Sequence, residues 1–288
     1  MIFKGTATAL ITPFTEDDKV DVQTIGNIVD MQIANGVDAL VALGTTGEPA
    51  TMSEKEKEQV VRTCVERVNG RIPLIVGAGS NSTRHAIQTC RMAQNLGADA
   101  LLVVTPYYNK CTQKGLVEHY GAIADSTSLP IICYNVASRT GVNMLPETFA
   151  HIASKHKNVV AIKEASGNME QIEQCLRLCP DMVISGDDAL TIPIMAMGGL
   201  GVISVASNVY PKFVSDMTHF ALDGDFEKAR KMQLALLPLV SALFCEVNPI
   251  PIKKAMELKG YCKGRLRLPL TEMTKNNTLR LASVMSDY

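Results

Sequence analysis

Eight short runs of apolar and β-branched residues recur along the first three quarters of this chain, separated by longer amphipathic segments. The centres of successive runs lie 19 to 34 residues apart, which leaves room for a helix between each pair. Most runs are apolar at consecutive positions, as expected of parallel strands that are buried on both faces. The predicted strands span residues 7–11, 39–43, 74–76, 100–104, 131–134, 159–163, 182–185 and 202–205.

Eight strand–helix units within the first 224 residues predict an α/β protein built as a closed (β/α)8 barrel, or TIM barrel. An open doubly wound sheet is the alternative, but no Gly-x-Gly-x-x-Gly turn follows the first run. After Gly224 the sequence has helical periodicity and no strand-like runs. We therefore predict a catalytic barrel over residues 1–224 and a C-terminal helical extension over residues 225–288.

The charge balance argues against a nucleic-acid partner. The chain has 28 Lys and Arg residues against 29 Asp and Glu residues, whereas a protein that binds phosphates needs a basic excess. One basic cluster is interrupted by Glu257, and we interpret it as a solvated helix face. Its members are Lys253, Lys254, Lys259, Lys263, Arg265 and Arg267.

The sequence also predicts a cytoplasmic protein without a membrane span or a cofactor. The N-terminal residues lack the pattern of a signal peptide, and the longest apolar run, 234–244, is shorter than the roughly 20 residues a membrane helix needs. The eight cysteines are scattered, so we interpret them as reduced thiols. The closest pair, Cys175 and Cys179, has no histidine nearby, and no metal site is predicted.

Active sites of such barrels lie at the carboxyl ends of the strands, where two side chains stand out. Lys163 ends the sixth predicted strand. Burial lowers the pKa of a lysine, and a neutral amine can form a Schiff base with a carbonyl compound; alternatively, the stem is buried and the ammonium reaches solvent. Tyr134 ends the preceding strand, where a phenol can transfer protons. Taken alone, the pattern favours a core tyrosine with a hydrogen-bonded hydroxyl.

Two other strand ends are suited to binding carboxylates. Gly44-Thr45-Thr46-Gly47 forms a tight turn with exposed amides and hydroxyls, although a simple strand-to-helix turn has the same composition. Arg139 offers a bidentate fork for a second carboxylate, or is a surface arginine. Asp187 and Asp188 precede a helical segment, and we predict that they cap it.

Several of these strand ends jointly resemble a known family, and the similarity runs along the whole chain. It is carried by the segments 44–48, 105–109, 134–136, 138–141, 163–165, 185–188, 201–204 and 248–251, which read GTTGE, TPYYN, YNV, SRTG, KEA, SGDD, GVIS and NPIP. Together they resemble the dihydrodipicolinate synthase family, within the pyruvate-dependent class I aldolases.

The resemblance implies an enzyme that condenses pyruvate with aspartate 4-semialdehyde, without a cofactor, in the diaminopimelate route to lysine. It implies that Lys163 forms the Schiff base and that Tyr134 shuttles protons. Thr45 and Tyr108 would complete the relay, Tyr108 being contributed across a subunit interface of a homotetramer made of two tight dimers. The implied substrate-binding residues are Thr46 for the pyruvate carboxylate, Arg139 for the aldehyde's carboxylate, and Gly186 and Ile203 through their backbones.

The sequence departs from the family pattern at two places. Ala137 replaces the usual proline, so the turn that carries Arg139 lacks a fixed φ. The positions that hold inhibitory lysine in regulated members differ here, which argues against feedback inhibition; they are Pro49, Glu54, Lys57 and His85.

Two alternatives to this function remain open from the sequence. One is another pyruvate lyase on the same scaffold, such as N-acetylneuraminate lyase or a 2-keto-3-deoxy-sugar-acid aldolase. Arg139 argues against it, because a second carboxylate needs a cation whereas a polyol needs hydroxyl partners. The other is a catalytically silent barrel, against which the intact set of relay residues and lysine argues.

Overall fold

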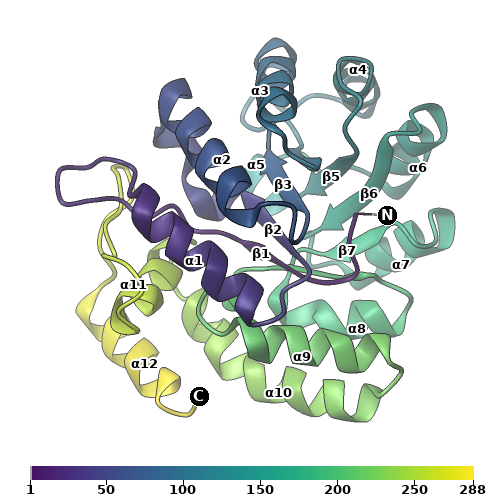
Figure 1. The fold of residues 1–288 in the computed structure, drawn as a ribbon. Helices are drawn as coiled ribbons and strands as arrows, with labels where there is room; N and C mark the ends of the chain where they lie inside the picture. Colours follow the sequence, from purple (N-terminus) through teal and green to yellow (C-terminus); the bar gives the residue numbers. More distant parts are fainter. Residues whose placement is uncertain (1) are drawn as a thin grey trace.

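The predicted runs form a closed, all-parallel barrel in the computed structural model, which describes residues 2–288. The strands pair in chain order and β8 closes the barrel against β1, so that the strands lie at the centre with helices around them (Figure 1). The strands are β1 (Gly5–Ala9), β2 (Ala39–Ala42), β3 (Leu74–Gly77), β4 (Ala100–Val104), β5 (Ile131–Asn135), β6 (Val159–Glu164), β7 (Val183–Ser185) and β8 (Gly201–Ser204).

Only the first strand differs from its predicted bounds by more than one residue. It begins at Gly5 because its register with β8 starts at the pair Gly5 and Gly201. The two backbones approach so closely there that a Cβ on Gly201 would lie 1.9 Å from the Gly5 carbonyl oxygen. Two glycines therefore begin a strand that the apolar pattern alone places two residues later.

Helices connect successive strands and cover the outside of the barrel. The connecting helices are α1 (Val22–Ala34), α2 (Glu54–Val68), α3 (Thr83–Leu96), α4 (Gln113–Ala124), α6 (Pro146–Lys155), α7 (Met169–Leu178), α8 (Thr191–Ala196) and α9 (Pro211–Leu222). Short helical turns at the carboxyl ends of strands are η1 (Thr45–Gly47), η2 (Pro49–Thr51), α5 (Ala137–Thr140), η3 (Asp188–Leu190) and η4 (Ala206–Asn208). The α2 helix begins with a capping box, in which Ser53 and Glu56 bond each other's backbone amides.

Alternate residues along each strand enter two separate cores. In β2, for example, Ala39 and Val41 point into the barrel whereas Leu40 and Ala42 pack under the helices. The same alternation in β6 directs Ala161 inward and Ile162 outward. Lys163, two residues beyond Ala161, therefore lies on the inner face of the strand.

Three helices follow Gly224, and residues 225–288 contain no strand. They are α10 (Phe226–Leu243), α11 (Ile250–Leu258) and α12 (Lys275–Met285), and α10 packs against α8, α9 and α12. In Figure 1 α11 and α12 lie together at one edge of the barrel, beside the N-terminal loop that precedes α1. Within residues 2–288 no helix is long and apolar enough to span a membrane.

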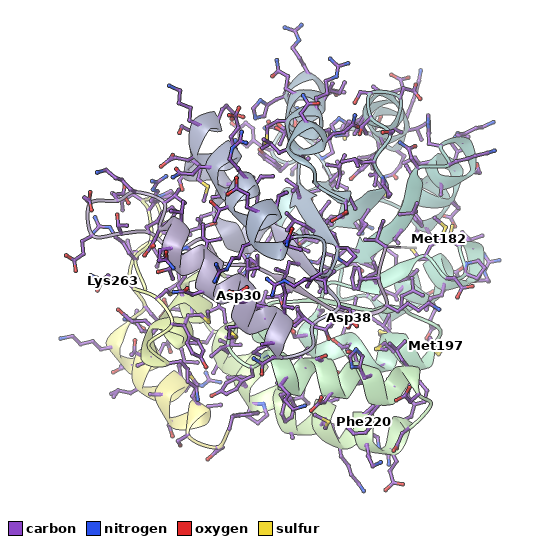
Figure 2. The ribbon with its side chains drawn as sticks, viewed as in Figure 1. Asp30, Asp38, Met182, Met197, Phe220 and Lys263 are labelled. Atoms are coloured by element: carbon purple, nitrogen blue, oxygen red, sulfur yellow. The ribbon has the colours of Figure 1, made fainter. Side chains whose placement is uncertain are left out.

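The prediction that the basic cluster forms one solvated helix face is wrong. Only Lys253 and Lys254 lie in α11, and Lys253 is 0% exposed. The segment after α11 is not helical and folds back over the N-terminal loop, where Lys263 pairs with Glu16 and Arg267 with Asp18. Arg267 also pairs with Glu56 of α2, and Figure 2 shows Lys263 at that outer edge. The charges therefore join chain segments that are distant in sequence, which helical periodicity does not reveal.

Candidate active site

A cavity of about 980 Å³ opens at the carboxyl ends of the barrel strands. Strand ends and the C-terminal helices build its wall together, because α10 and the segment after it lie across the barrel mouth. From the barrel it is lined by Thr45, Thr46, Tyr134, Arg139, Lys163, Ala165, Gly186 and Asp187, and from the later segment by Leu237, Val240, Ser241 and residues 244–248.

Lys163 and Tyr134 face each other inside the barrel. They are register partners on β6 and β5, and the Lys163 Nζ lies 4.3 Å from the centroid of the Tyr134 ring. Lys163 is 6% exposed, so its amine is largely shielded from solvent. The alternation of the two strands thus places an amine and a phenol beside the same cavity.

The stem of Lys163 fills space that Gly186 leaves. A Cβ on Gly186 would lie 2.9 Å from Lys163 Cε and 2.7 Å from the Ala165 Cβ. Gly186, at the end of β7, also donates its backbone N–H to the Glu164 carbonyl. Glycine at this position therefore permits the close approach of β7 to the lysine side chain.

The turn after β2 presents two threonines to the cavity. Thr45–Gly47 forms η1, whose first amides have no partner within the turn. Thr46 is buried, and its Oγ1 accepts a 3.0 Å hydrogen bond from the Asn248 side chain. This arrangement of hydroxyls and amides suits a carboxylate.

Arg139 lies on α5, lines the same cavity and is exposed. Its Nη2 donates to the backbone carbonyl of Asn248 over 3.1 Å. Ala137, where the family has proline, is the first residue of α5, and Thr140 ties the turn down by bonding the Val142 carbonyl at 2.9 Å. Side-chain hydrogen bonds thus fix the turn without the proline ring.

The structure brings six of the predicted site residues to one cavity and leaves two apart. Tyr108 is 89% exposed with φ +72° and does not line the cavity. Ile203 is buried in the barrel interior and pairs with Ala7. Asp187 caps η3 by accepting from the Ala189 amide, as predicted, whereas Asp188 is buried and accepts from the Val205 amide instead of capping.

Behind Lys163 lies a polar network that the sequence reasoning missed. Glu164 points outward and accepts hydrogen bonds from the Ser166 amide and from the side chains of Asn135 and Gln171, over 2.8 to 3.3 Å. Burial raises the pKa of Glu164. The network joins the ends of β5 and β6, which carry Tyr134 and Lys163. In the sequence, the only sign of this network is the polar residue directly after the lysine.

A second cavity of about 380 Å³ adjoins the first and shares Thr45, Tyr134 and Arg139 with it. Of the four positions that hold inhibitory lysine in regulated family members, Pro49, Lys57 and His85 line it. The fourth, Glu54, pairs with Lys57 at 2.8 Å. The expectation that lysine does not inhibit stays a prediction.

No group of three metal-ligating side chains suited to an ion occurs within residues 2–288.

The fold and the cavity define an enzyme of the (β/α)8-barrel class, with its site at the carboxyl ends of the strands. The chain belongs to the dihydrodipicolinate synthetase family, whose sequence model matches residues 2–287. The 4-hydroxy-tetrahydrodipicolinate synthase of Caldicellulosiruptor bescii is 51% identical over 288 residues, which cover 100% of this chain and 97% of that protein.

Solved structures agree with this assignment. The dihydrodipicolinate synthase of Thermotoga maritima has a TM-score of 0.97 and 45% identity, covering 100% of this chain and 99% of that one. The enzyme of Acinetobacter baumannii, solved in complex with pyruvate, has a TM-score of 0.97 and 40% identity, with the same coverage. The predicted family, enzyme class and closed barrel are confirmed, and the open sheet is excluded.

Proposed function

We propose that this chain condenses pyruvate with aspartate 4-semialdehyde to give 4-hydroxy-tetrahydrodipicolinate, in the diaminopimelate route to lysine. Full-length relatives named 4-hydroxy-tetrahydrodipicolinate synthase support the reaction. The observation that carries the chemistry is the buried Lys163, whose Nζ lies 4.3 Å from the Tyr134 ring centroid and lines the cavity.

In the proposed reaction the neutral amine of Lys163 attacks the keto carbon of pyruvate, and water leaves to give an imine. Loss of a methyl proton turns the imine into an enamine. The enamine carbon then forms a bond to the aldehyde carbon, whose oxygen takes up a proton. Displacement of the lysine by the amino group of the second substrate closes the ring and returns the free amine. Tyr134 is proposed to carry protons between these steps together with Thr45. Both residues line the cavity.

Different parts of the site are assigned to the two carboxylates. The turn that carries Thr46 is proposed to take the pyruvate carboxylate, because its hydroxyl and amides are donors and it lines the same cavity as Lys163. Arg139 takes the carboxylate of the aldehyde as a charge-assisted pair. Gly186 and Ile203 are proposed to contribute backbone contacts, and Gly186 lines the cavity.

Tyr108 is proposed to complete the relay of a second subunit in a homotetramer of two tight dimers. Its exposure of 89% and its left-handed backbone support this role, because a tyrosine at positive φ is costly without a compensating contact. We also propose a cytoplasmic location, which the sequence supports through eight cysteines without a paired disulfide pattern.

A trapping experiment tests the proposal directly. Borohydride with pyruvate should add a stable pyruvyl mass to the intact protein, located on Lys163 by peptide mapping, because the imine is reducible and the free amine is not. Lys163→Ala should gain no mass under the same treatment. An unchanged mass of the wild-type chain would overturn the Schiff-base mechanism.

The choice of second substrate needs a separate assay. Pyruvate with aspartate semialdehyde should be turned over, while N-acetylneuraminate and 2-keto-3-deoxy-sugar acids should not be cleaved at a comparable rate. The reverse preference would assign the site to the other pyruvate lyases.

A further inference from the structure

A second buried lysine lies outside the cavity, in α11. Lys253 is 0% exposed, and its ammonium forms an ion pair with the carboxylate of Glu48, which is 4% exposed. The same Nζ donates to the Arg265 carbonyl at 2.8 Å and lies 4.1 Å from the centroid of the Phe14 ring. Lys253 is absent from the lining of either cavity at the barrel mouth, so its partners, not a substrate, explain its burial.

Glu48 is the residue that closes the turn presenting Thr45 and Thr46. Its backbone has φ 55° and ψ 39°, the left-handed conformation, and ends η1 while beginning η2. This conformation is costly for a residue other than glycine and persists only where the surroundings hold it. The shape of the turn therefore depends on what fixes Glu48.

The side chain of Glu48 has few partners that could fix it. Its Oε2 accepts a 3.3 Å hydrogen bond from the Arg267 amide. No hydrogen bond within residues 2–288 reaches Oε1, so the Lys253 ammonium is the compensating charge on that oxygen. Because both groups are buried, losing one of them leaves an unpaired charge in an apolar site.

We propose that Glu48 and Lys253 are a positioning pair, which sets the Thr45–Gly47 turn and thereby the binding site for the pyruvate carboxylate. The inference rests on the proposed function, since it takes this turn as the carboxylate site. The pair acts through the backbone of Glu48, and it ties the turn to α11 more than 200 positions further along the chain. A second link from the same segment, Asn248 to Thr46, reaches the turn from the cavity side.

The proposal predicts a change in pyruvate binding that loss of stability alone does not produce. If the pair only stabilised the fold, folded molecules without it would bind pyruvate normally. If the pair sets the turn, folded molecules without it hold the two threonines incorrectly, and more pyruvate is needed to form the imine. The useful readout is therefore the pyruvate concentration at half-maximal borohydride trapping, measured on the folded full-length chain.

Lys253→Met and Glu48→Gln each remove one charge at nearly constant size. We expect each to raise the half-saturating pyruvate concentration tenfold or more. Lys254→Met is the matched control: it makes the same substitution one position later, in a lysine that pairs with Glu257 and not with Glu48. It should leave half-saturation within twofold of wild type.

Glu48→Asp keeps the charge and replaces the neutral variants as the test if those variants do not fold. The shorter side chain keeps the ion pair only by shifting the turn, so half-saturation should rise at least threefold. Values within twofold of wild type, in either folded neutral variant or in Glu48→Asp, would overturn the positioning role. If the wild-type protein fails to trap pyruvate, the proposed function itself is overturned. If the wild type traps pyruvate and the variants have the same half-saturating pyruvate concentration, only the positioning role of the pair is overturned.

Discussion

Asn248 donates a hydrogen bond from its side-chain amide to Thr46 Oγ1 over 3.0 Å, across 202 positions of the sequence. Its backbone carbonyl accepts another hydrogen bond from Arg139 Nη2. One residue between α10 and α11 thus contacts both elements to which we assign carboxylate binding. The segments that follow the barrel therefore form part of the site as well as of the fold.

Asn248→Ala should raise the KM for pyruvate about twofold to tenfold, because a hydrogen bond of about 0.5 to 1.5 kcal/mol that orients Thr46 is lost. Asn248→Asp should raise the KM for pyruvate further, since a carboxylate cannot donate a hydrogen bond to Thr46 and repels the carboxylate of the substrate. Steady-state kinetics with varied pyruvate test this. Equal KM values in wild type and Asn248→Asp would show that the hydrogen bond does not orient the threonine.

Tyr134→Phe and Thr45→Val should each lower kcat by roughly 10²-fold or more, because general acid–base groups typically contribute that much. Pyruvate should still bind, since Lys163 and Thr46 are retained. Turnover with aspartate semialdehyde, measured beside borohydride trapping, separates the two effects. A kcat near wild type in both variants would mean that the proton relay is assigned to the wrong residues.

Arg139→Ala should lower kcat/KM for the aldehyde roughly tenfold to a hundredfold, the equivalent of a charge-assisted hydrogen bond of about 1.5 to 3 kcal/mol. Pyruvate trapping should change far less. Arg139→Lys should recover only part of the lost kcat/KM, because the point charge of an ammonium does not reproduce the bidentate geometry of the guanidinium. If trapping and aldehyde turnover fell equally, the arginine would instead hold the turn through its bond to Asn248.

Gly186→Ala should slow pyruvate trapping tenfold or more, because the added Cβ would lie 2.9 Å from Lys163 Cε and displace the lysine stem. Gly26→Ala is the control, since a Cβ on that α1 residue meets only ordinary contacts with Arg67 at 3.6 Å. The trapping rate at saturating pyruvate is the measurement. A rate equal to that of the control would show that the lysine adapts to the extra methyl.

His119 should make the unfolding free energy depend on pH. It is buried, with Nδ1 bonded to Thr83 Oγ1 at 2.9 Å, and burial lowers its pKa from 6.5 to about 4. Between these values the unfolded chain binds a proton that the folded chain does not, so the stabilising contribution is present above pH 6.5 and is lost as the pH falls toward 4. The unfolding free energy should therefore be lower at pH 4 than above pH 6.5 by on the order of 3 kcal/mol from this histidine.

His119→Gln should flatten this dependence, which denaturant unfolding at several pH values between 4 and 7.5 would detect. The exposed His151 on α6 provides the control, because His151→Gln should leave the wild-type slope unchanged. A slope identical to that of wild type in His119→Gln would show that the imidazole binds its proton equally in the folded and the unfolded chain.

Local sequence patterns are sufficient to predict the barrel and the meeting of Lys163 with Tyr134. Runs of consecutive apolar residues report burial on both faces, and their spacing requires crossover helices, so a closed parallel barrel follows from local pattern. Once the strands are parallel and adjacent, their carboxyl ends meet at one rim, and side-chain alternation places both residues inside it. The capping box of α2 was readable for the same reason, because its partners are three positions apart.

Which charges are buried, and which segments complete the cavity, depends on how distant elements pack together. Lys253 and Lys254 are indistinguishable in sequence, yet one pairs with Glu48 inside the protein and the other faces Glu257 at the surface of the same helix. Asn248 reaches Thr46 only because the end of α10 and the segment after it lie across the barrel mouth. Local periodicity reports which face of an element is apolar, but contacts between segments some 200 positions apart arise from the packing of whole elements, and no short pattern encodes them.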